Sequence, residues 1–185
     1  VRRALEIYLS LRTAGVLTHV SSAQAAADGR PRLRLAVDLP ADFALNQPLA
    51  PFALAAMDLL NVEAPEHTVD VVSVVEATLD DPRPLLYAQQ RAARGEAIAA
   101  MKAEGMDYEE RMAALEEITW PQPLSELLTP ALEMYKQANP WIAEHELAPK
   151  SVVREMVENA MTFSDLISRY DLGRSEGVVL RYLTD

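Results

Sequence analysis

Prolines set the strongest limit on how this chain of 185 residues can fold. From Pro48 onward they separate stretches that are rich in alanine and leucine, which are strong helix formers. A proline lacks a backbone N–H and its ring clashes with the preceding turn, so it ends or bends a helix. The sequence therefore predicts a mainly α fold, a multi-helix bundle in which prolines set many of the helix boundaries.

Hydrophobic periodicity and cap residues place the individual helices. Residues 66–79 are rich in β-branched side chains, but the stretch is long for a strand and does not alternate, so we expect a buried helix. Gly95 is expected to interrupt a long helix, and Pro130 is expected to kink a later one. The predicted helices are 1–13, 51–60, 66–79, 85–105, 107–118, 124–138, 150–161, 162–173 and a last one from about Arg174.

The N-terminal region has a different pattern. Residues 15–20 and 32–39 alternate between apolar and polar side chains, which is typical of strands. Small and polar residues at 21–31, with a turn signal at Asp28-Gly29, predict a loop between them. The order of helix, strand, loop and strand is similar to the last helix and wing of a winged-helix module. It also fits any helix that is followed by a β-hairpin.

The change of pattern near residue 48 predicts two domains. We expect a winged-helix-like helix and small β-hairpin at 1–47, and a helical bundle at 48–185. Helical patterns run to both ends of the sequence, which begins without methionine. This favours a piece of a larger protein.

Charge is distributed unevenly along the chain, whose formal net charge is −11. Residues 1–40 carry six basic and three acidic side chains, and residues 41–149 carry six basic and nineteen acidic ones. Residues 150–185 are nearly balanced, with five basic and six acidic side chains. Because nucleic-acid surfaces neutralise phosphate charge, the acidic middle block is a poor candidate for one. Its acidity also fits a solvated surface that keeps the protein soluble.

No catalytic or metal-binding motif is found in the sequence. The chain has no cysteine, and it lacks the phosphate loop, the dinucleotide-binding glycines and the common hydrolase and metalloprotease motifs. His145 lies between Glu144 and Glu146, but no second histidine stands at a ligand spacing, so we expect a surface histidine. There is no signal peptide and no apolar run long enough to span a membrane. We therefore expect no catalytic residue, no metal ligand and no membrane partner, and a cytoplasmic location.

Clustered arginines are the remaining candidates for a binding surface. A planar guanidinium is suited to bidentate contact with phosphate. One group decorates the predicted wing and the other lies on the last helices: Arg30, Arg32 and Arg34, then Arg154, Arg169, Arg174 and Arg181. The alternative is that the second group pairs at the surface with nearby carboxylates, which contributes little stability. Those carboxylates are Glu155, Glu158, Asp171 and Glu176.

Several long phrases carry a resemblance to a known family. The phrases are LPADFALNQPLAPFALAAMDLL, TVDVVSVVEATLDDPR, RGEAIAAMKAEGMDYEERMAALEEITWPQPL, NPWIAEHELAPKSVVREM and MTFSDLISRYDLGRSEGVVLRYLTD. On these phrases, from about Ala14 to Asp185, the chain resembles the C-terminal domain of actinobacterial DEAD/DEAH-box helicases, a domain of unknown function. Glu176, Gly177 and Arg181 form an E-G-x-x-x-R pattern. More remotely, the chain resembles the C-terminal domain of HelY-like, exosome-associated RNA helicases, in which such a pattern precedes the final helix.

The resemblance implies a place in a larger ATP-dependent helicase. ATP and Mg²⁺ would then be bound and hydrolysed by the helicase core domains of the same polypeptide, and this chain would be a non-catalytic accessory domain that packs on them. By the same resemblance, the chain would help to guide an RNA or DNA strand. Arg174 and Arg181 are the first candidates to contact the strand, followed by Arg154 and Lys150, while Arg32 and Arg34 would contact it from the wing.

Two other functions fit the sequence. The acidic region 41–149 could instead recruit a basic protein partner, which makes the chain a helical protein-interaction module. An independent winged-helix DNA-binding protein is a further possibility, supported only by the hairpin and its arginines. These alternatives predict different responses to nucleic acid and to salt.

Overall fold

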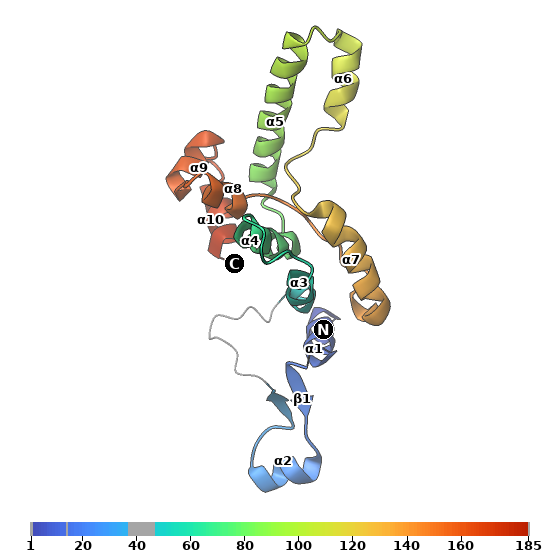
Figure 1. The fold of residues 1–185 in the computed structure, drawn as a ribbon. Helices are drawn as coiled ribbons and strands as arrows, with labels where there is room; N and C mark the ends of the chain where they lie inside the picture. The colour runs from blue at the N-terminus through green and yellow to red at the C-terminus, as the bar shows by residue number, and fades with distance from the viewer. Residues whose placement is uncertain (1, 14, 37–46, 185) are drawn as a thin grey trace. The chain divides into compact units, whose positions relative to one another are not determined.

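The computed structural model describes residues 2–13, 15–36 and 47–184. Within these residues the chain forms ten α-helices, one 3₁₀ turn and a two-stranded antiparallel hairpin (Figure 1). The predicted fold class is therefore confirmed: the protein is mainly α, with a small β-hairpin near its N-terminus.

Contacts along the chain divide it into two compact units, each built from two separate stretches of sequence. Unit 1 comprises residues 1–59 and 126–147. Unit 2 comprises residues 60–125 and 148–185. Each tryptophan of the chain lies in a different unit, Trp141 in unit 1 and Trp120 in unit 2.

Unit 1 begins with helix α1 (Arg2–Thr13), and Gly15 stands just beyond its end. Gly15 has a left-handed φ of 72°, the conformation that glycine adopts at no steric cost, so the predicted end of this helix is confirmed. Strands β1 (Leu17–His19) and β2 (Leu33–Leu35) follow and pair in antiparallel register, with Thr18 opposite Arg34. The part of the predicted second strand from residue 37 lies outside the described residues.

The segment between the two strands is not the predicted loop. It forms helix α2 (Ser22–Asp28), visible between the strands in Figure 1. The side chain of Ser21 caps its N-terminus by accepting the backbone N–H of Gln24, and Gly29 closes its C-terminus in the left-handed conformation. The prediction was wrong because these two caps act on a run of small, alanine-rich residues, which has high helix propensity.

The rest of unit 1 consists of α3 (Ala50–Met57), α7 (Ser125–Ala138, of which Ser125 belongs to unit 2) and the 3₁₀ turn η1 (Pro140–Ile142). Helix α3 packs on α7 through an edge-to-face contact between Phe52 and Tyr135, whose ring centroids lie 5.5 Å apart. Burial raises the pKa of the Tyr135 phenol.

Unit 2 contains α4 (His67–Thr78) and a helical hairpin formed by α5 (Arg83–Ala103) and α6 (Tyr108–Glu116). The β-branched stretch is a helix, as predicted. Helix α5 is continuous through Gly95, so the predicted interruption there was wrong. A single glycine costs a helix only about 1 kcal/mol, which the neighbouring alanines tolerate. Asp107 caps α6 by accepting the N–H of Glu110.

Three short helices complete unit 2: α8 (Val153–Glu158), α9 (Phe163–Arg169) and α10 (Glu176–Thr184). The predicted helix start at Thr162 is confirmed, because Thr162 and Asp165 form a reciprocal capping box. These helices gather beside α4 and the first turns of α5 in Figure 1. Their shared core consists of Leu85, Leu86, Ala88, Val152, Leu166, Ile167, Leu172, Val179 and Tyr182.

Candidate functional site

The structure separates the predicted wing arginines. The side chain of Arg32 is exposed on the hairpin. Arg34 instead folds back on its own segment, where its guanidinium lies 3.1 Å from the carboxylate of Asp28 and donates to the carbonyl of Pro31. Of these two candidates, Arg32 is thus the one whose guanidinium is presented to solvent.

Arg154 is held inside unit 2 by carboxylates on two helices. Its side chain is 15% exposed and lies 2.7 Å from Asp70 of α4 and 2.8 Å from Glu158 of α8. Although burial opposes the charge, these two carboxylates raise the pKa of Arg154. The pairing with Glu158 is the surface alternative expected from the sequence, and Asp70 extends it across to α4. Arg154 therefore joins α8 to α4.

Lys150 is fully buried. Its ammonium donates to the carbonyl oxygens of Leu79 at 2.8 Å and Ala148 at 2.6 Å, and it lies 3.2 Å from the carboxylate of Asp81. Burial lowers the pKa of Lys150, while Asp81 acts in the opposite direction. All three partners are supplied by the protein, so this conformation leaves no ammonium face for a strand, and Lys150 joins the chain before α8 to the end of α4.

Arg174 and Arg181 are exposed near and on the last helix. Arg174 lies just before α10, and Arg181 lies in its final turn. Gly177 is in the first turn of the same helix, with open space where a side chain would stand. The structure therefore brings the E-G-x-x-x-R residues onto one short helix and gives their arginine an outward position.

Glu76 of unit 2, which the sequence did not single out, forms several hydrogen bonds at once. Glu76 is 2% exposed. Its carboxylate accepts the backbone N–H groups of Val152, Val153 and Arg154, at 3.0, 2.8 and 3.1 Å, and the phenolic O–H of Tyr182 at 2.8 Å. Glu76, which belongs to α4, thus caps the N-terminus of α8 and also accepts a hydrogen bond from a side chain of α10. The one signal in the sequence is a glutamate placed within an apolar, β-branched helix.

A second carboxylate of unit 2 forms hydrogen bonds with side chains from α5 and from the end of α9. Glu155 accepts the Nε2 group of Gln89 at 2.7 Å and the phenolic O–H of Tyr170 at 2.7 Å. Burial and this carboxylate raise the pKa of Tyr170 to about 12. Arg169 also lies 3.3 Å from Glu155, which is again the surface alternative expected from the sequence.

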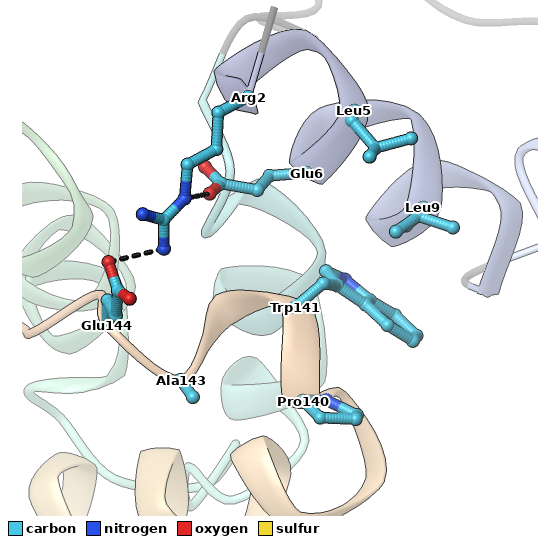
Figure 2. Close-up of a pocket in the computed structure, with 8 residues that line it drawn as sticks. All are labelled: Arg2, Leu5, Glu6, Leu9, Pro140, Trp141, Ala143 and Glu144. Carbon is cyan, nitrogen blue, oxygen red and sulfur yellow. Dashed lines mark hydrogen bonds and ion pairs between the residues drawn. The ribbon is translucent and has the colours of Figure 1, made fainter.

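Unit 1 contains a hollow of about 250 Å³ between α1 and η1. Figure 2 shows Arg2 reaching from α1 to the carboxylates of Glu6 and Glu144, while Leu5, Leu9, Pro140 and Trp141 provide apolar walls. The indole N–H of Trp141 donates to the hydroxyl of Ser10 at 3.0 Å, which fixes the turn against α1.

His145 belongs to this arrangement. The histidine side chain is 30% exposed, and its Nε2 atom lies 3.0 Å from the carboxylate of Glu6, a contact that the sequence did not predict. Hydrogen bonding from His145, aided by Arg2, lowers the pKa of Glu6 against the opposing effect of burial. The contact could not be read from the sequence because Glu6 stands 139 positions away and only the fold brings the two together.

A shallow apolar groove lies between α3 and α7 of unit 1. It is lined by Phe52, Ala55, Ala56, Leu59, Ala131, Met134 and Tyr135. In residues 2–13, 15–36 and 47–184 there is no group of three or more histidine, cysteine or acidic side chains placed to hold a metal ion. The described helices also include none that has both the length and the apolar character of a membrane span.

Comparison with known proteins places the whole chain in one family. A family model described as a domain of unknown function, DUF3516, matches residues 1–185. The chain belongs to the DUF3516 family. No curated protein and no solved structure matches it.

Proposed function

We propose that this DUF3516 chain is a non-catalytic accessory domain of an ATP-dependent RNA or DNA helicase, and that its last helix helps to guide the nucleic-acid strand. The observation that carries the proposal is the outward position of Arg174 and Arg181 at α10. The sequence resemblance supplies the helicase context, in which ATP and Mg²⁺ act in core domains of the same polypeptide.

The setting of these two arginines supports the proposal. Arg154 and Lys150 are largely shielded from solvent inside unit 2, whereas Arg174 and Arg181 are exposed. Both exposed arginines belong to the segment 150–185, which carries five basic and six acidic side chains, whereas 41–149 carries six basic and nineteen acidic ones, so their segment is better suited to approach phosphates. On the hairpin of unit 1, Arg32 is the exposed counterpart.

The experiment is a fluorescence anisotropy titration of a labelled single-stranded RNA, and separately of a DNA duplex, with the 185-residue chain. It is carried out at about 50 mM and about 200 mM salt. The R174Q/R181Q variant is expected to bind at least about tenfold more weakly, because each charged hydrogen bond that it cannot form is worth more than about 1.4 kcal/mol. Its salt slope should be smaller by about 0.7 for each phosphate that the variant no longer neutralises.

A matched control removes the same charge elsewhere in unit 2. Arg83 and Arg91 are exposed on α5, so the R83Q/R91Q variant has the same net charge as the test variant. It should bind like the parent chain. Equal weakening in the two double variants would show general charge attraction, and a parent chain that binds neither nucleic acid would refute the proposed function.

A second function is favoured by helix α6, which buries none of its residues. Glu109, Glu110, Glu116 and Glu117 are all exposed on or next to it, together with Tyr108, which is 68% exposed. This surface supports the alternative of an acidic module that recruits a basic protein. Replacing the four glutamates by glutamine should abolish salt-sensitive capture of that protein, and unchanged capture would count against the alternative.

A further inference from the structure

The first half of helix α5 presents a basic face to solvent. Arg83 and Arg91 are exposed there, and Tyr87 lies between them with 53% of its side chain exposed. The three side chains are four positions apart, so they lie on one side of the helix and span about 12 Å along its axis. The ring of Trp120 packs edge-to-face against that of Tyr87, with the ring centroids 6.5 Å apart. We call Arg83, Tyr87 and Arg91 the basic face.

Helix α6 carries the complementary pattern in the same order. Glu109 and Glu116 are exposed, and Met112 lies between them at 44% exposure. Spacings of three and four positions place the three side chains on one side of the helix, over about 10.5 Å. This acidic face (Glu109, Met112 and Glu116) therefore matches the basic face in charge, in its central apolar side chain and nearly in length.

The two faces are offset along the hairpin of their own chain. Helix α5 ends at Ala103 and the chain reverses at Gly105, so α6 lies along the second half of α5, whereas the basic face lies on the first half. At the far end of α6, the carbonyl of Ile118 accepts hydrogen bonds from Gln90 at 2.9 Å and Arg94 at 3.2 Å, which fix this offset. Figure 1 shows α6 beside α5 and away from α8, α9 and α10.

The charges of both faces are left without partners in the single chain. Within the part of the chain that the structure describes, Arg83, Arg91, Glu109 and Glu116 form no ion pair. Helix α6 also buries none of its residues. The hairpin thus presents two complementary surfaces that its own geometry keeps apart.

A second copy of the chain would remove the offset. When two hairpins lie side by side and point in opposite directions, the acidic face of each lies beside the basic face of the other. A two-fold axis relates the copies, so every contact is made twice. Both charge pairs can form together because the two faces differ in length by only about 1.5 Å. Ala92 and Gly95, between the two contacts, are exposed and small, so they do not hold the helices apart.

We propose that the α5–α6 hairpin is a self-association surface, on which the basic face of one chain binds the acidic face of a second copy. Charge complementarity identifies the occupant, since the chain itself supplies both faces in matching order. A nucleic-acid strand is disfavoured here, because the hairpin belongs to the block 41–149 with its nineteen acidic side chains. The surface includes neither Arg174 nor Arg181, so it can be tested independently of RNA binding.

Sedimentation equilibrium of the 185-residue chain is the first experiment, over about 5–200 µM protein. A dimer is expected, and it should be weaker at about 500 mM salt than at about 50 mM, where the charges are less screened. The R83Q/R91Q variant should dimerise at least about tenfold more weakly, because the symmetry removes each charge pair twice. Its matched control is R174Q/R181Q, which has the same net charge and should dimerise like the parent chain.

A charge exchange tests which faces meet. R91E and E116R each place like charges opposite one another, so each variant alone should dimerise at least about tenfold more weakly than the parent. An equimolar mixture of the two should recover the dimer. One contact then pairs the two introduced charges, which attract each other, and the other contact keeps the original pair. Both positions are exposed, and far-UV circular dichroism of each variant checks that its helices are intact.

The outcomes decide the occupant. A dimer that R91E and E116R each weaken and that their mixture restores supports self-association. A parent chain that stays monomeric at about 200 µM overturns it, as does a mixture that stays monomeric. Equal weakening in R83Q/R91Q and R174Q/R181Q also overturns it. If R83Q/R91Q dimerises like the parent but binds RNA more weakly, the basic face binds nucleic acid instead. Capture of a basic protein by α6 of a monomeric chain would likewise replace the second copy.

Discussion

Each unit of the protein contains a buried glutamate that joins segments far apart in sequence, but the two glutamates use different partners. Glu6 of unit 1 is bonded by the charged or titratable side chains of Arg2 and His145. Glu76 of unit 2 is bonded by three backbone N–H groups and a phenol. The comparison teaches that buried glutamates can connect distant segments in two ways. The contacts of Glu6 depend on the charge of its partners and so on pH and salt, whereas those of Glu76 depend on the geometry of its hydrogen-bond donors.

The largest expected effect is that of E76A. Removing this carboxylate leaves several buried donors without an acceptor, so unit 2 should lose about 4 kcal/mol of unfolding free energy. E6A should cost unit 1 only about 1 kcal/mol, because its partners can turn to solvent. Urea unfolding followed by the single tryptophan of each unit measures the two values, with W141F reporting unit 2 through Trp120 and W120F reporting unit 1 through Trp141. Equal losses of unfolding free energy in E76A and E6A would show that the two glutamates do not differ in this way.

The next effect concerns the lysines of the two units. K150M removes a buried ammonium from two carbonyl oxygens and Asp81, and should destabilise unit 2 by about 3 kcal/mol. The matched variant K136M breaks the pair with Glu133 on α7, whose carboxylate is 64% exposed, and should change unit 1 by less than about 0.5 kcal/mol. A K150M variant as stable as the parent chain would show that the two carbonyl oxygens and Asp81 do not outweigh the cost of burying this charge.

A smaller effect is the pH dependence of the stability that Glu6 gives to unit 1. The folded-state pKa of Glu6 is lowered from its ordinary value of 4.5, chiefly by hydrogen bonding from His145. Its stabilisation is therefore present above the ordinary pKa and is lost as the pH falls through the lowered one. The difference in stability between the parent chain and E6Q, measured in the W120F background, should be present at about pH 7 and shrink toward about pH 3. A difference that grows on acidification would contradict the assignment of the pair.

The smallest effect is that of salt. The guanidinium of Arg2 and the carboxylate of Glu144 form an ion pair that is mostly exposed, with side-chain exposures of 68% and 73%. R2Q should lower the melting temperature of unit 1 slightly at low ionic strength and not measurably at about 1 M salt, where the pair is screened. The effect of Y182F on unit 2 should be the same at both salt concentrations. If the effect of Y182F on melting temperature changed with salt, the contact of Tyr182 with Glu76 would be chiefly a charge effect.

The sequence predicted the helices well because helix signals are local. The capping pair of Thr162 with Asp165 and the β-branched helix 66–79 were found from spacing alone. The missed helix α2 carried a local signal too, since Ser21 and Gly29 stand at its two ends. The buried roles of Glu76 and Lys150 could not be predicted, because their partners are supplied by distant segments. A charged residue near an apolar stretch looks the same in sequence whether it faces solvent or the core.

The division of each unit into two sequence segments has a consequence for the order of events during synthesis. The bond from Trp141 to Ser10 spans 131 residues, and the one from Tyr182 to Glu76 spans 106. At about 5–20 residues per second, α1 emerges from the ribosome on the order of ten seconds before its partner turn exists. Neither unit can close until its later sequence segment has been synthesised. The nascent segment depends meanwhile on local helices such as α5.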